Sequence, residues 1–205
     1  FLFKMSEQEF PEFNLTIKHI RGVSPVGDET KIIARHAKAL QPQTALDMGC
    51  GTGFISIYLN NQGINCEAAD INLNAIELTK ENAKKNNVEL ISYHSDLFQN
   101  IQKKYDLITF NAPYGNTSSA KSSKMLEFIK SFIPKKTIIT KISYYFIRNK
   151  RKELTKKFLE QAQAHLNENG KCILLMDNYE MDLLKDKKQR VLEPFFGGQI
   201  VLVES

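Results

Sequence analysis

The sequence predicts one α/β domain of the Rossmann-like, doubly wound class, with a mostly parallel seven-stranded sheet that ends in a C-terminal antiparallel hairpin. Three observations predict this class. The chain has 205 residues, which is enough for one domain with a substantial core and short for two. Short apolar runs alternate with amphipathic stretches of helical spacing. A glycine-rich turn joins the first strand of this alternation to the helix that follows it.

The first half of the chain has the pattern of repeated strand and helix units. Its strands are short apolar runs, and its helices place apolar side chains three or four positions apart. Turn residues such as Gln41-Pro42-Gln43 and Gly63 separate these elements. In chain order we expect a helix at 32–40, a strand at 44–49, a helix at 54–62, a strand at 65–71 and a helix at 74–87.

The second half predicts the remaining strands and one clear helix. That helix, KELTKKFLEQAQAHLNEN, is amphipathic and should end at Gly170, a residue type common after helix C-termini. Residues 114–150 are the least regular part, and their IPKKTIITKISYYFI run fits either a strand or a helix. We expect strands at 88–95, 105–113 and 171–177, a helix at 152–169, and a hairpin of strands 189–196 and 199–205 around Gly197 and Gly198.

Composition indicates a folded, soluble protein, because hydrophobic residues make up 42% of the chain and charged residues 25%. No apolar run approaches the roughly 18 residues that a membrane span needs, and no signal peptide is evident. We therefore expect a cytoplasmic protein without membrane contact. The cysteines suit buried reduced thiols, and the histidines show no metal-ligand spacing, so we expect no metal site. These residues are Cys50, Cys66, Cys172, His19, His36, His94 and His165.

Positive charge is concentrated in residues 121–157, which hold twelve Lys or Arg and two acids. The whole chain carries a net charge of +5, so the remainder is acidic. Such a stretch favours a polyanion, RNA or DNA, or an acidic protein surface as partner. A solvated lysine-rich helix face is an equally good interpretation of the charges alone.

The turn at Gly49-x-Gly51-x-Gly53 predicts a nucleotide-like ligand, because it lets the backbone approach a ligand closely at a helix N-terminus. Phe54 stands where the dinucleotide fingerprint has its third glycine, so a pyrophosphate is not the best fit. Asp47, directly before the turn, would repel a phosphate and suits a ligand with a positive centre. S-adenosylmethionine has a sulfonium and an ammonium group.

Further acids end the next two predicted strands. Asp70 lies 17 residues beyond Gly53, where it could accept hydrogen bonds from both ribose hydroxyls, with Ile71 beside it. Asp96 and Leu97 end the third strand, where a carboxylate could accept from an adenine amino group beside an apolar cover. Taken alone, each acid is more often a helix cap or a solvated loop residue. Their order and spacing together predict the cofactor site.

The fourth predicted strand ends in Phe110-Asn111-Ala112-Pro113-Tyr114, at the edge where open α/β sheets bind ligands. Methylation of a planar nitrogen requires that its delocalised lone pair be aimed at the methyl carbon. An Asn oxygen and a backbone carbonyl can accept the two N–H bonds, a proline fixes the backbone, and a tyrosine ring can stack on the planar group. An ordinary Asn-Pro-type turn is the alternative.

With these motifs the chain resembles the class I methyltransferases over roughly residues 20–205. The resemblance implies S-adenosylmethionine as cofactor, with its methionine part near the glycine turn, its ribose on Asp70 and its adenine near Asp96 and Leu97. The residues implied around the methionine part are Asp47, Gly49, Gly51 and Gly53.

The Asn-x-Pro-Tyr turn is similar to the motif of the amino-methyltransferases, which include release factor glutamine methyltransferases and adenine-N6 methyltransferases. The resemblance gives catalytic roles to Asn111, Pro113 and Tyr114, and Asn111 also borders the cofactor. Ala112 departs from the commonest form, which has proline there. The segment at 22–31 is similar to the one ahead of the first helix in release factor methyltransferases, and its Pro25 and Thr30 are the positions implied to help close the cofactor site.

The resemblance divides the chain into an N-terminal segment, 1–30, which partly closes the cofactor site, and a methyltransferase domain, 31–205. Residues 114–150 are then an irregular basic insertion on the substrate side. Three functions remain open: a protein glutamine N-methyltransferase, an RNA or DNA adenine-N6 methyltransferase, and a non-catalytic methyltransferase-like subunit. Single-domain members of this length can depend on a partner subunit.

Overall fold

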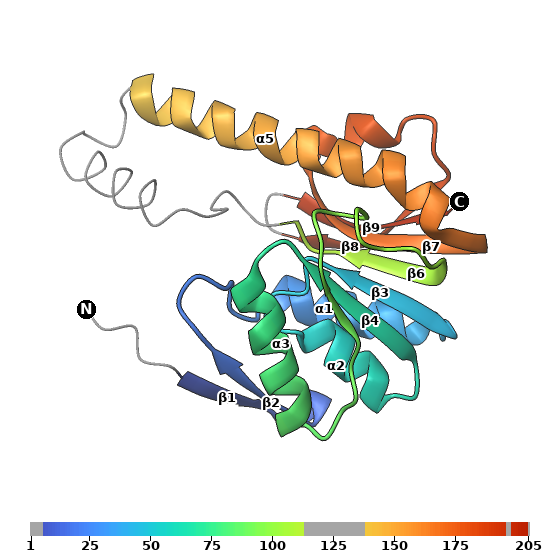
Figure 1. The fold of residues 1–205 in the computed structure, drawn as a ribbon. Helices are drawn as coiled ribbons and strands as arrows, with labels where there is room; N and C mark the ends of the chain where they lie inside the picture. Colours follow the sequence, from blue (N-terminus) through green and yellow to red (C-terminus); the bar gives the residue numbers. More distant parts are fainter. Residues whose placement is uncertain (1–5, 113–137, 196–197, 205) are drawn as a thin grey trace.

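A computed structural model describes residues 6–112, 138–195 and 198–204, with backbone alone for 138–147. In these residues a sheet lies between two layers of helices (Figure 1). Three short 3-10 helices, at Pro11–Phe13, Gln163–His165 and Asn178–Leu184, link larger elements. Those elements are β1 Ser6–Phe10, β2 Leu15–His19, α1 Asp28–Ala39, β3 Thr44–Met48, α2 Phe54–Asn61, β4 Asn65–Asp70, α3 Leu73–Lys85, β5 Ser92–His94, β6 Tyr105–Phe110, α5 Ile138–Ala162, β7 Leu166–Asp177, β8 Gln189–Phe195 and β9 Gly198–Glu204.

The sheet confirms the predicted fold class. The described residues form seven strands in the order β5-β4-β3-β6-β7-β9-β8. Neighbours from β5 to β7 are parallel, whereas β9 is antiparallel to both β7 and β8. The last strand therefore inserts between β7 and β8, and the predicted C-terminal hairpin closes the sheet.

Strand residues alternate between two cores, as the period of two in a β-strand requires. Ala45, Leu107 and Ile173 face one core, which they share with α1, α2 and the β1–β2 hairpin. The residues next to them in each strand face a second core, which contains Phe158 and Leu159 of α5. Helices therefore cover both faces of the sheet, α1 and α2 on one side and α5 on the other (Figure 1).

The β1–β2 hairpin was not predicted from the sequence. In β1 only Phe10 is buried, so the strand lacks the alternation that marks a half-buried strand. The hairpin packs on α2 through aromatic rings: the centroid of Phe13 lies 4.9 Å from that of Phe54 and 5.0 Å from that of Tyr58. Tertiary packing, rather than local pattern, places these residues in strands.

The predicted helix at 152–169 is confirmed over residues 152–162, but its predicted end at Gly170 was wrong. Helix α5 already begins at Ile138, so the last part of the 114–150 stretch is helical rather than irregular, and α5 ends at Ala162. Gly170 lies inside β7, where the register with β6 shifts between Tyr105 and Leu107. A Cβ at this glycine would lie 2.9 Å from the Asn167 carbonyl oxygen. The glycine therefore belongs to an irregular part of a strand and does not end a helix.

Smaller boundary differences occur in α1 and β5. Helix α1 begins at Asp28, four residues before its first predicted residue, and its first turn carries two acids, which suits the positive end of the helix dipole. Strand β5 is shorter than the predicted 88–95. None of the described helices combines the length and hydropathy needed to cross a membrane.

Candidate active site

The carboxyl ends of the parallel strands bring the predicted site residues into one row. Met48 of β3 pairs with both Ala69 of β4 and Phe110 of β6. The next residue of each strand is therefore at the same level along the sheet edge, with neighbouring strands about 4.8 Å apart. These residues are Gly49, Asp70 and Asn111. Since β5 pairs with β4 up to His94 and Asp70, Asp96 extends the row at its other end.

The glycine turn has the backbone that its sequence predicts. Gly49, Gly51 and Gly53 have φ angles of 71°, 55° and 78°, a region that other residues rarely adopt. A Cβ at Gly53 would lie 2.8 Å from Thr79 Cγ2 of α3, so a larger residue would also collide there. A Cβ at Gly51 would contact only Val23, at 3.8 Å, among the described residues. The turn thus presents bare backbone at the N-terminus of α2.

Asp70 joins the turn to the end of β4. One of its carboxylate oxygens accepts from Gly51 N at 3.0 Å, and the other accepts from Asn72 N at 2.8 Å. Burial raises the pKa of Asp70, and these hydrogen bonds oppose that shift. Each oxygen keeps a further lone pair for a ligand hydroxyl. Ile71 beside it is 59% exposed and offers apolar surface at the same place.

Asp96 and Leu97 follow β5 in a tight turn. Asp96 is exposed, and Leu97 is buried with a φ of 47°. Ser95 Oγ donates to the Leu97 carbonyl at 2.6 Å and so holds this left-handed backbone. The carboxylate predicted for the adenine end is therefore open to solvent, while the leucine belongs to the core.

Asp47 lies inside the domain rather than on the surface of the turn, with 2% of its area exposed. Its carboxylate accepts from Thr109 Oγ1 at 3.0 Å and from Ser56 N at 3.3 Å. It thus ties β6 to the first turn of α2. Burial raises the pKa of Asp47 to about 7, and hydrogen bonds from Thr109 and Ser56 oppose this shift.

The buried Asp47 predicts a pH dependence of stability. Between its ordinary pKa of 3.8 and its folded pKa of about 7, the folded state holds a proton that the unfolded state has lost. The stability that this proton provides is fully present below 3.8 and is lost as the pH rises through about 7. Urea unfolding of the wild type and of Asp47→Asn between these limits should show the wild type losing stability relative to the variant, on the order of a few kcal/mol. A pH-independent difference would contradict the assignment.

Asn111 is held by Thr30, which joins two predicted site residues. Asn111 Nδ2 donates to Thr30 Oγ1 of α1 at 3.2 Å, so the side-chain oxygen lies on the other side of the amide, available to accept. Pro25 is exposed in the segment that leads into α1. Pro113 and Tyr114, to which we assigned catalytic roles, lie outside the described residues.

A buried arginine that the sequence analysis missed fixes the residue after Asn111. Arg151 of α5 donates from Nη1 to the Ala112 carbonyl at 3.1 Å and from Nη2 to the Leu175 carbonyl of β7 at 2.8 Å. Its Nε pairs with Glu180 at 3.0 Å, and both side chains are almost fully buried. A basic residue on the apolar stripe of α5, in line with Phe158, was the signal available in the sequence.

The sequence profile of the methyltransferase small domain matches residues 22–133, more than half of the chain. The chain belongs to this family. The resemblance to the class I methyltransferases is thereby confirmed. The matched segment runs from the loop before α1 through the glycine turn and past Asn111.

Relatives of this chain are named for different acceptors. A candidate protein N5-glutamine methyltransferase of Methanocaldococcus jannaschii is 39% identical over 92 residues, 44% of this chain and 47% of that protein. The ribosomal RNA small subunit methyltransferase C of Pseudoalteromonas translucida is 33% identical over 116 residues, 56% of this chain and 33% of that one. The chain spans less than half the length of these curated relatives.

A solved structure shows the same fold. The 16S rRNA N2-G1207 methyltransferase of T. thermophilus, in complex with S-adenosylmethionine and guanosine, superposes with a TM-score of 0.69 at 16% identity. The match covers 98% of this chain and 50% of that one. At this identity the likeness concerns the fold alone.

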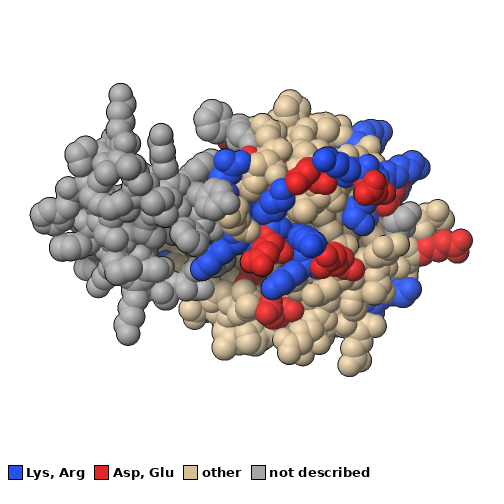
Figure 2. All heavy atoms as spheres, turned by 90° about the horizontal axis from the view of Figure 1, so that it is seen from above, with Lys and Arg blue, Asp and Glu red and all other residues tan. Residues whose placement is uncertain are grey.

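The basic stretch at 121–157 is partly neutralised where it is described. Figure 2, which views the molecule from above Figure 1, shows acids among the basic side chains on the face that it presents. Lys152 pairs with Asp182 at 2.6 Å, and Lys156 lies 3.8 Å from Glu160. Arg148 lies 3.9 Å from the centre of the Tyr179 ring. Among the described residues, no three His, Cys, Asp or Glu side chains gather as metal ligands would.

Proposed function

We propose that this chain binds S-adenosylmethionine along the row of strand ends and methylates a planar nitrogen, the side-chain amide of a protein glutamine. The observation that carries the proposal is the order of the row: Asp96, Asp70, the glycine turn and Asn111 follow one another across β5, β4, β3 and β6. In S-adenosylmethionine the adenine, the ribose and the methionine chain follow one another in this order, and the methyl acceptor lies beyond the sulfur. When bound, the cofactor supplies an electrophilic methyl group on its sulfonium.

The side chains present fit this cofactor. Asp70 keeps acceptor capacity for the ribose hydroxyls, and the exposed Ile71 offers apolar surface beside it. The turn has bare backbone at Gly51, where a ligand can approach closely. Asp70 places a carboxylate at the turn, where it accepts from Gly51 N, and its negative charge favours a cationic ligand over a phosphate.

Asn111 is the residue that orients the acceptor. Its side-chain oxygen, set by the Thr30 hydrogen bond, accepts an N–H of the acceptor amide and stabilises the positive charge that develops on nitrogen. A backbone carbonyl accepts the second N–H, Pro113 restricts the loop, and Tyr114 stacks on the planar group. The proton leaves the nitrogen once the methyl group is attached.

A glutamine acceptor is favoured over a nucleic acid because several basic side chains in the described part of the stretch already have partners. Lys152 and Lys156 have acidic partners, and the Arg151 guanidinium is buried. A surface that follows phosphates needs basic groups that remain available to them. An RNA or DNA adenine is the second candidate, supported by the charge of residues 121–157 and by the rRNA methyltransferase among the relatives. The free thiols of the three buried cysteines support a cytoplasmic location.

A direct assay separates the two acceptors. Purified chain is incubated with radiolabelled S-adenosylmethionine and either a Gln-containing peptide, the matched Glu peptide, or an adenine-containing RNA. We expect label on the Gln peptide and none on the Glu peptide. Label on the RNA alone, with binding that weakens steeply as salt rises, would replace the glutamine proposal by the nucleic-acid one.

The ribose role of Asp70 predicts a loss of cofactor affinity. Asp70→Asn removes the charge and one of the two acceptors, so the dissociation constant for S-adenosylhomocysteine should rise about tenfold or more by calorimetric titration. The control is Asp106→Asn, which changes a carboxylate at the opposite end of β6 that accepts from Thr44. This variant should leave the affinity for S-adenosylhomocysteine unchanged. Equal affinity for wild type and Asp70→Asn would remove Asp70 from the site.

A further inference from the structure

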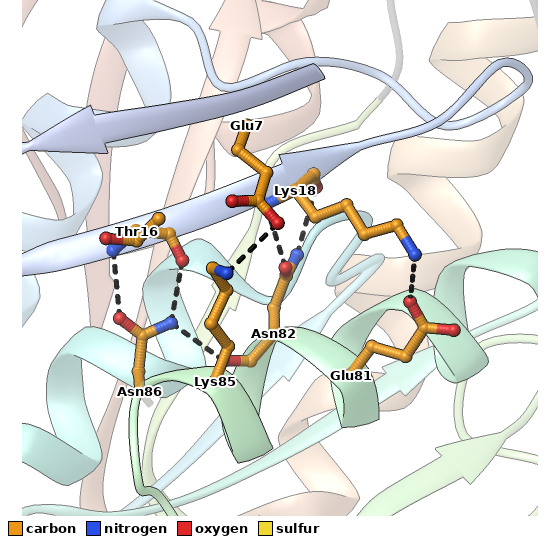
Figure 3. Close-up of polar contacts among 7 residues, drawn as sticks. All are labelled: Glu7, Thr16, Lys18, Glu81, Asn82, Lys85 and Asn86. Carbon is orange, nitrogen blue, oxygen red and sulfur yellow. Dashed lines mark hydrogen bonds and ion pairs between the residues drawn. The ribbon is translucent and has the colours of Figure 1, made fainter. Parts of the chain in front are cut away.

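Two asparagines, Asn82 of α3 and Asn86 at its C-cap, contact β2 as a neighbouring strand would (Figure 3). The Asn82 amide accepts from Lys18 N at 2.8 Å and donates to Lys18 O at 3.1 Å. The Asn86 amide does the same with Thr16, at 2.9 and 2.8 Å. Four helical residues rise about 6.0 Å and two strand residues span about 6.6 Å, so the two spacings match. The two amides thus bond the backbone N–H and C=O groups on the edge of β2 that β1 leaves unpaired.

Ion pairs flank these amides but add little. Lys18 pairs with Glu81 at 2.5 Å and Lys85 pairs with Glu7 at 3.0 Å, and all four side chains are partly or largely exposed (Figure 3). Exposed pairs of this kind contribute at most about 1 kcal/mol. The amides are therefore the main polar contacts between the hairpin and α3.

The two asparagines differ in the acceptor to which the second side-chain N–H donates. Asn82 donates it to the Thr52 carbonyl at 2.9 Å, whereas Asn86 donates it to the Asn82 carbonyl of its own helix at 2.7 Å. Thr52 lies between Gly51 and Gly53 in the glycine turn. Asn82 is fully buried and uses both N–H groups and its oxygen. Asn82 therefore connects the β1–β2 hairpin to the turn.

The hairpin also determines which way the Asn82 amide faces. The Lys18 backbone N–H can only donate, so it requires the Asn82 oxygen and turns Nδ2 toward Thr52. Thr79, one turn earlier on α3, donates to the adjoining Gly51 carbonyl at 3.2 Å. Glycines lose more conformational freedom on ordering than other residues, so a turn with three of them depends on such contacts for a fixed shape.

We propose that Asn82 is a positioning residue of the cofactor site, and that the β1–β2 hairpin orders the glycine turn through it before a ligand binds. This inference rests on the proposed function. The hairpin, Ser6–His19, precedes the segment that the family profile matches, so the proposal adds it to the functional unit. A turn that is already ordered loses less conformational entropy when the ligand binds, so its affinity for the ligand is higher.

The test compares Asn82→Ala with Asn86→Ala, because both lose the paired contacts with β2 and only the first loses the Thr52 contact. Calorimetry with S-adenosylhomocysteine should give affinity about tenfold weaker for Asn82→Ala, and within about twofold of wild type for Asn86→Ala. Hydrogen exchange of the peptide covering Gly49–Phe54, measured without ligand, should be faster in Asn82→Ala alone. Thermal unfolding sets a temperature at which all three proteins are folded.

Equal affinities and equal exchange in the two variants would overturn the proposal, since the hairpin would then serve stability alone. Should Asn82→Ala be too unstable, Asn82→Asp keeps the volume and the acceptor for Lys18 N but has no N–H for the Lys18 and Thr52 carbonyls, and the same two readouts apply. A wild type that does not bind S-adenosylhomocysteine would overturn the proposed function and the affinity claim with it. The exchange measurement separately decides whether Asn82 orders the turn.

Discussion

Replacing Asn111 by alanine should reduce turnover at least about 100-fold while leaving affinity for S-adenosylhomocysteine within about twofold of wild type. The reason is that the Asn111 oxygen acts on the acceptor nitrogen, where charge develops, and Thr30 already occupies its N–H side. The loss should appear in kcat and not in the KM for the cofactor. Initial rates with the Gln peptide at saturating S-adenosylmethionine measure this.

The Thr30 hydroxyl offers a matched control for Asn111. Thr30→Val removes the partner of Asn111 Nδ2 and keeps the shape of the side chain, so the amide loses its fixed orientation but not its oxygen. We expect a loss of about tenfold, smaller than for Asn111→Ala. An Asn111→Ala variant with near wild-type turnover would show that another residue orients the acceptor.

Arg151→Met should lower the free energy of unfolding by about 3–5 kcal/mol, the largest stability effect that we expect from one substitution. The change leaves the Glu180 carboxylate buried without its guanidinium, and leaves the Ala112 and Leu175 carbonyls without this donor. Breaking a buried pair costs more than the pair contributes, because the remaining charge is not solvated. Urea unfolding monitored by circular dichroism measures the difference.

Lys152→Met is the matched control, since Lys152 is the next residue of α5 and pairs with Asp182 at the surface. Its effect should stay within about 0.5 kcal/mol. The double variant Arg151→Met/Glu180→Leu removes both charges and should recover much of the stability lost in the single variant. Equal destabilisation by Arg151→Met and Lys152→Met would mean that the buried pair does not hold the Asn111 turn in place.

The sequence was sufficient for the part of the site that depends on local pattern. The spacing of Gly49, Gly51 and Gly53 predicts a turn with positive φ angles, and all three glycines have them. Acids at the ends of successive predicted strands share one sheet edge, because parallel strands end on the same side. The register that brings Asp70 and Asn111 level with Gly49 follows from that topology.

Contacts between distant segments could not be predicted. Asn82 looks like an ordinary polar residue of an amphipathic helix, and its role depends on β2, about sixty residues earlier in the chain. The signal available was a pair of asparagines four apart, Asn82 on the buried face of α3 and Asn86 at its C-cap. By sequence alone Arg151 is one of the basic residues of 121–157, because its partners, Glu180 and Leu175, lie in later elements of the chain.

We infer that one row of strand ends binds S-adenosylmethionine with Asn111 at the methyl acceptor end. A crystal structure with S-adenosylhomocysteine bound measures this directly. We expect the adenine near Asp96, the ribose hydroxyls within hydrogen-bond distance of Asp70, and the sulfur facing the Asn111 side-chain oxygen across the space for one acceptor group. A ligand whose ribose lies away from Asp70, or whose sulfur points away from Asn111, would show that this row of strand ends is not the methyl-transfer site.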